Sequence, residues 1–82
     1  MAIILSTNGQ TADIYGGRHF IRTILNGGTA TIKLNLAGGD SSFSDFDDNV
    51  LSEGIKLIDL PGGKIELTST GAASVELVRV DW

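Results

Sequence analysis

Paired glycines are the feature that most restricts the fold of this chain. Eight of its eleven glycines fall in four pairs, at 16–17, 27–28, 38–39 and 62–63, and the first three pairs are eleven residues apart. Two adjacent glycines can both take positive φ, as the centre of a tight hairpin turn requires. Turn signals at such regular spacing are typical of an all-β sandwich or barrel. A β-solenoid repeat is the alternative, but the acidic segment 40–48 breaks the repeat.

The segments between these glycines alternate as β-strands do. In the segment 29–36, Ala30, Ile32 and Leu34 share one side, while Thr31 and Lys33 lie on the other. The segment 64–68 alternates in the same way, and the Pro-Gly-Gly sequence at 61–63 separates it from the β-type run 55–60. We therefore expect 55–60 and 64–68 to form a hairpin. No apolar stripe of helical period runs for ten residues, so we expect no long helix.

Length and composition predict one small domain. The chain has 82 residues and no cysteine, so no disulfide supplements its core. A chain of this size buries only roughly 60% of its unfolded surface. Hydrophobic residues make up 41% of it, as in globular proteins. We predict an all-β fold in a single domain, 1–82, namely a small antiparallel β-sandwich or barrel, jelly-roll-like, with about six to eight short strands.

Three of the β-type runs carry apolar side chains on both faces. They are 19–25, 55–60 and 74–82, and the last changes phase between Leu77 and Val78. Such a run is a central strand with mixed packing, a bulged strand, or a strand whose second face is covered by another chain. The last interpretation, together with two phenylalanines of the acidic loop, gives these interface candidates: Phe20, Ile21, Ile24, Leu25, Val78, Val80, Trp82, Phe43 and Phe46. Trp82 is the expected anchor, because aromatic residues dominate interface hot spots.

The loop 40–49 holds four carboxylates and is the best candidate for cation binding. Asp45, Asp47 and Asn49 have the first three ligand spacings of an EF-hand. Val50 then stands where that motif needs glycine, and Lys56 stands where it needs glutamate. We therefore predict a solvated loop, with no metal site and no cofactor.

The sequence also lacks the residue sets of an enzyme. His19 is the only histidine, and it falls within a β-type run with no nucleophile motif around it. Paired carboxylates can do acid–base work, but a chain this short and glycine-rich leaves little room for a deep cleft. The net charge of −4 argues against binding to nucleic acid or to an anionic membrane. We predict no catalytic residues and no nucleic-acid or membrane partner.

Three segments together resemble a known class of proteins. They are 27–34 (GGTATIKL), 58–67 (IDLPGGKIEL) and 73–80 (ASVELVRV). In this order, with a polar loop after the first, they look like small β-sandwich structural proteins of tailed bacteriophage virions. The acidic stretch 45–48 departs from that class, in which a tryptophan-containing segment is frequent. The resemblance rests on turn and strand patterns and implies no catalytic residues.

The resemblance implies a virion protein that binds and stabilises the capsid shell as a decoration or cement protein, or a small head–tail or fibre component. Its expected partners are the major capsid protein or another virion protein and further copies of itself. The segment 1–10 lacks the basic start of a signal peptide, so we expect synthesis in the bacterial host cytoplasm and a final location in the virion. The alternative is a small carbohydrate- or protein-binding β-sandwich module, which would need exposed aromatic platforms. An enzyme is the least favoured class.

Overall fold

The structure is all-β in the part of the chain that it describes. The computed structural model describes residues 2–39, 42–46 and 49–80 and shows eight strands and no helix there. The strands are β1 (Ala2–Leu5), β2 (Thr11–Ile14), β3 (Gly17–Ile24), β4 (Thr29–Leu36), β5 (Val50–Leu51), β6 (Gly54–Leu60), β7 (Gly63–Thr70) and β8 (Ser74–Arg79).

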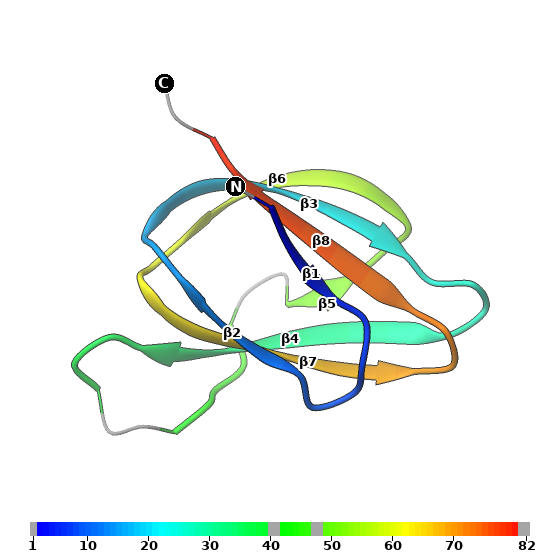
Figure 1. Cartoon of the computed structure of the whole chain (residues 1–82), viewed down its shortest axis with the longest axis horizontal. Coiled ribbons are helices and arrows are strands. Elements are labelled where there is room, and N and C mark those ends of the chain that lie inside the picture. The colour runs from blue at the N-terminus through cyan, green and yellow to red at the C-terminus, as the bar shows by residue number, and fades with distance from the viewer. Residues whose placement is uncertain (1, 40–41, 47–48, 81–82) are drawn as a thin grey trace.

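The strands form two stacked antiparallel sheets of four strands each. One sheet has the order β1-β8-β3-β6 and the other β2-β7-β4-β5, and we call them the 1-8-3-6 sheet and the 2-7-4-5 sheet. In Figure 1, β3, β6 and β8 lie in the upper part of the sandwich and β2, β4 and β7 in the lower part. The chain changes sheet at every connection except that between β4 and β5. This is the arrangement of a jelly roll, so the predicted fold class is confirmed.

The inner faces of both sheets share one apolar core. The predicted alternation of 29–36 holds, because Ala30, Ile32 and Leu34 are buried, whereas Leu36 lies past the end of the core and is 56% exposed. The inward residues of the opposite sheet complete the interior. The buried apolar set is Leu5, Ile14, Ile21, Ala30, Ile32, Leu34, Leu51, Leu60, Ile65, Leu67, Ala73, Val75 and Leu77.

The predicted hairpin around Pro61 is wrong. Strand β6 pairs with β3 in one sheet, whereas β7 pairs with β2 and β4 in the other, so residues 61–62 carry the chain between the sheets. The connection from β2 to β3 crosses beside it, and a Cβ on Gly16 would lie 3.1 Å from the Gly62 nitrogen. The two crossings therefore touch through their backbones. Glycine at 16 and 62 allows this close approach and forms no hairpin turn.

Gly63 is the position where this crossing depends most on glycine. Its φ is 150°, in the region that L side chains rarely adopt, and a Cβ there would overlap the carbonyl oxygen of Asn35 on β4. Gly9 also has positive φ, at 85°, but a Cβ there would meet nothing within 4 Å. Comparing substitutions at Gly63 and Gly9 therefore separates the effect of backbone strain from the effect of steric overlap.

We expect Gly63→Ala to lower the free energy of unfolding by about 2–3 kcal/mol, because strain and overlap act together. Gly9→Ala should cost only about 1 kcal/mol, because strain acts alone. Urea unfolding followed by circular dichroism measures both. Equal losses in the two variants would contradict the close packing of this crossing.

Candidate interaction surface

The outer face of the 2-7-4-5 sheet is polar along β2, β7 and β4, as a face in contact with water should be, and carries one exposed apolar residue, Val50, on the short edge strand β5. Its central cross-strand neighbours are Thr31 with Thr68 and Lys33 with Glu66. At one end, the Nζ atom of Lys64 lies 3.7 Å from the Oδ1 atom of Asp13. This sheet therefore presents no extended apolar surface along its centre.

The outer face of the 1-8-3-6 sheet is different. Ala2 lies opposite Val78, Val78 opposite Phe20, and Phe20 opposite Leu57, so one apolar row crosses all four strands. Within this row the exposed fraction is 36% for Val78, 38% for Phe20 and 45% for Leu57. A row of this kind is unusual on a sheet face that water covers.

The next row combines apolar and charged side chains. Ile4 lies opposite Glu76, Glu76 opposite Arg22, and Arg22 opposite Ile55. The two isoleucines, on the edge strands, are 61% and 71% exposed, and the two charged residues lie on the central strands. Ile24 and Ser74 form the third row. We call these three rows the apolar face: Ala2, Ile4, Phe20, Arg22, Ile24, Ile55, Leu57, Ser74, Glu76 and Val78.

A depression interrupts the apolar face over β8. It has a volume of about 220 Å³ and is lined by residues of β1, β3 and β8, namely Ile4, Arg22, Ile24, Ser74, Val75 and Glu76. Ser74 is much smaller than its cross-strand neighbour Ile24, so the surface is lower over β8 than over β3. The face therefore has relief as well as apolar character.

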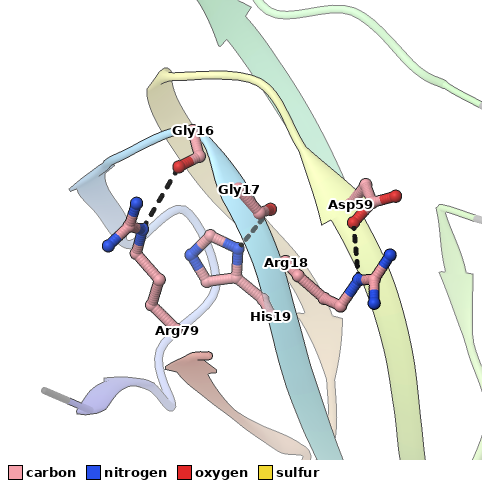
Figure 2. Close-up of polar contacts among 6 residues, drawn as sticks. All are labelled: Gly16, Gly17, Arg18, His19, Asp59 and Arg79. Atoms are coloured by element: carbon pink, nitrogen blue, oxygen red, sulfur yellow. Dashed lines mark hydrogen bonds and ion pairs between the residues drawn. The ribbon is translucent and has the colours of Figure 1, made fainter. Parts of the chain in front are cut away.

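A group of polar contacts lies where the chain enters β3 (Figure 2). The Nε atom of Arg18 donates to the Oδ1 atom of Asp59 at 3.2 Å, which joins β3 to β6. The Nε atom of Arg79 donates to the carbonyl of Gly16 at 3.1 Å, where the chain enters β3. Because backbone groups at a sheet crossing leave the ladder, such donors stabilise the crossing. The side chains that make these two contacts are exposed, so the contribution of the contacts to stability is small.

His19 belongs to the same group and has a structural role. Its side chain is buried, with 2% of the residue exposed, and its Nδ1 atom is 3.0 Å from the carbonyl oxygen of Gly17. Figure 2 shows the ring turned toward that carbonyl. The ring is held by its own strand and covered from solvent, so it packs as part of the interior at this end of β3.

The predicted interface residues on or next to β3 and β8 do not all lie on the same face of the sheet. Phe20, Ile24 and Val78 lie on the apolar face, and Val80 follows β8 half-buried, with its N–H donating to the carbonyl of Arg18 at 2.8 Å. Ile21 is excluded from the surface, because it points into the core and is 1% exposed. The register runs without a bulge through Leu77 and Val78, so the change of phase in the sequence separates the inner from the outer face.

The remaining candidates lie elsewhere. Leu25 packs against the core just after β3, and its N–H donates to the Oε1 atom of Glu53 at 2.7 Å. Phe43 and Phe46 are half-buried in the connection between β4 and β5, which projects at the lower left of Figure 1, and Phe46 packs against the core. Trp82, the expected anchor, lies outside the described residues.

Seven of the ten residues of the apolar face, all but Phe20, Ile24 and Val78, are not among the interface residues predicted from the sequence. Ile55 and Leu57 lie in the run 55–60, which the sequence predicts as one strand of a hairpin, and no distinctive local pattern surrounds the other five. The signal available for 55–60 was its lack of alternation. Without the register between strands far apart in the sequence, no pattern brings these residues together.

The acidic loop offers no cation site in its described part. The side-chain amide of Asn49 donates to the Oδ1 atom of Asp45 at 3.0 Å. Among residues 2–39, 42–46 and 49–80, no group of three or more Asp, Glu, His or Cys side chains is placed to hold a metal ion. Asp40, Asp47 and Asp48 lie outside these ranges.

Comparison with known proteins finds no family model, curated protein or solved structure that matches this chain. Within the described residues, the structure contains no helix with the length and apolar character needed to cross a membrane. The apolar face of the 1-8-3-6 sheet is therefore the candidate functional surface on structural grounds alone.

We expect the apolar face to contribute little to folding. Leu57→Ala should change the free energy of unfolding by less than about 1 kcal/mol, because Leu57 is already half in water. The matched control is Leu77→Ala in the same sheet, whose side chain faces the core, and it should cost about 2–5 kcal/mol. Urea unfolding of the two variants tests this expectation. A large loss in Leu57→Ala would mean that the face is needed for the fold rather than for contact.

Proposed function

We propose that this chain is a non-enzymatic structural protein of a bacteriophage particle, which binds and stabilises the capsid shell as a decoration or cement protein. The observation that carries the proposal is the apolar face of the 1-8-3-6 sheet. The protein makes its assembly contacts through this face.

The contrast between the two sheets supports a role in assembly. Each sheet needs only its inner face for the core, and the outer face of the 2-7-4-5 sheet is polar. Phe20, Leu57 and Val78 nevertheless form a continuous apolar row on the outer face of the other sheet. Contiguous apolar surface on a small protein marks a site of contact with another protein.

The size of the chain and its sequence resemblance support the kind of assembly. A single domain of 82 residues has a small core, and contact with further subunits adds the buried area that the chain alone lacks. The segments 27–34, 58–67 and 73–80, which resemble virion proteins, are the parts of the chain that contain β4, the crossing from β6 to β7, and β8.

The test is binding to capsids that lack the protein. Particles are assembled from a phage in which the gene for this chain is deleted, mixed with the purified protein, and pelleted. The wild-type protein should pellet with the particles. Leu57→Asp should remain in the supernatant, because a carboxylate in the apolar row loses its water on contact.

The matched control is Thr68→Asp, which adds the same charge to the polar outer face of the other sheet. It should pellet as the wild type does. The proposal fails if the wild-type protein does not pellet with particles, or if Leu57→Asp pellets as well as Thr68→Asp.

A further inference from the structure

We infer that the apolar face binds a second copy of this chain in a two-fold arrangement. The inference deepens the proposed function and rests on it: within the particle, the protein that covers this face is a neighbouring copy of the chain, and Leu57→Asp loses the particle because it loses that pairing. The two-fold axis lies in the plane of the contact and runs parallel to the strands, between β8 and β3. This symmetry places β8 of one copy on β3 of the other, and β1 on β6.

The charges of the apolar face are complementary under this symmetry. Arg22 and Glu76 are cross-strand neighbours on β3 and β8, so the axis places Arg22 of each copy opposite Glu76 of the other. Neither residue has an ion-pair partner among the described residues of its own chain. One dimer therefore holds the pair twice, at its centre, where apolar side chains limit access of water.

Two other face-to-face arrangements do not pair Arg22 with Glu76. A two-fold axis that runs across the strands along the row of Arg22 places Arg22 of one copy opposite Arg22 of the other, and Glu76 opposite Glu76. An axis along the row of Phe20 places Arg22 opposite Arg18, which is already paired with Asp59, so Arg22 gains no acidic partner of its own there. Like charges in direct opposition disfavour a contact from which water is removed, and of these three axes only the one parallel to the strands pairs Arg22 with Glu76.

The relief of the face fits the same symmetry. Ile24 of one copy lies over Ser74 of the other, where the depression of about 220 Å³ begins. Phe20 likewise lies over the smaller Val78. In each of the three rows, the larger residue of the central pair lies on β3 and the smaller one on β8. Across the contact, each large residue therefore meets a small one. The strands of the two copies run within about 30° of each other, as in stacked sheets.

The extent of the face sets the strength of the dimer. Four strands and the length from Arg18 to Ile24 give a face about 19 Å wide and about 20 Å long, or about 400 Å². A standard interface buries about 800 Å² on each partner. The dimer is therefore weak in solution and forms only at high protein concentration. Copies held close together on a shell would pair at this affinity.

The test mixes two charge-reversed variants. Arg22→Glu leaves two carboxylates at the centre of the face, and Glu76→Arg leaves two cations. Sedimentation equilibrium from about 10 µM to about 1 mM should show dimers of the wild type, with dimerisation of each variant weakened by at least about tenfold. An equimolar mixture of the two variants should dimerise again, because both contacts then join opposite charges.

The matched control reverses a neighbouring pair on the polar sheet. Lys33→Glu and Glu66→Lys make the same changes in net charge, and each should dimerise as the wild type does. Circular dichroism confirms that all four variants are folded. The inference is overturned if the wild type stays monomeric to about 1 mM, if Arg22→Glu dimerises as well as Lys33→Glu, or if mixing restores nothing.

The two proposals fail in different ways. A wild-type protein that is monomeric in solution but pellets with capsids through Leu57 would overturn the dimer and leave the proposed function standing. A protein that dimerises with the expected charge pattern but ignores capsids would overturn the virion function and leave the dimer standing.

Discussion

The rest of the structure depends on one shared core, filled from both sheets of a very short chain. The strands change sheet at six of the seven connections, so both sheets must be built together around that core. This brings two crossings into direct contact at Gly16 and Gly62, and it places the carbonyl of Asn35 where a side chain at 63 would be. Glycine at 16 and 62 follows from the close approach of the two crossings, and glycine at 63 follows from the close approach of β7 to its neighbour β4 within one sheet.

The small core uses only the inner residues of the sheets, so the difference between the two outer faces is informative about contacts with other proteins. A core supplied by the inner residues alone leaves both outer faces available, and only one of them is polar. The other carries Phe20, Leu57 and Val78 in one row and a central pair of opposite charges in the next. A face of this size and pattern suits contact with another protein subunit rather than a deep binding site or a catalytic centre.

The sequence predicts the parts of this account that depend on local pattern. Alternation along 29–36 identifies β4, and apolar residues of both phases in 19–25 and 74–80 indicate strands that are apolar on both faces. The crossing at Pro61 could not be recognised, because a proline followed by two glycines is equally typical of a hairpin. The opposition of Arg22 and Glu76 depends on pairing between residues more than fifty positions apart, which no local pattern contains.

The central claim is that copies of this chain meet through the apolar face. Amide chemical shifts recorded by two-dimensional NMR over a dilution series test it most directly, because they locate the contact residue by residue. We predict concentration-dependent shifts at Phe20, Arg22, Leu57 and Glu76, with none at Thr31 and Thr68 on the opposite outer face. Shifts confined to the 2-7-4-5 sheet, or no shift anywhere up to about 1 mM, would contradict the claim.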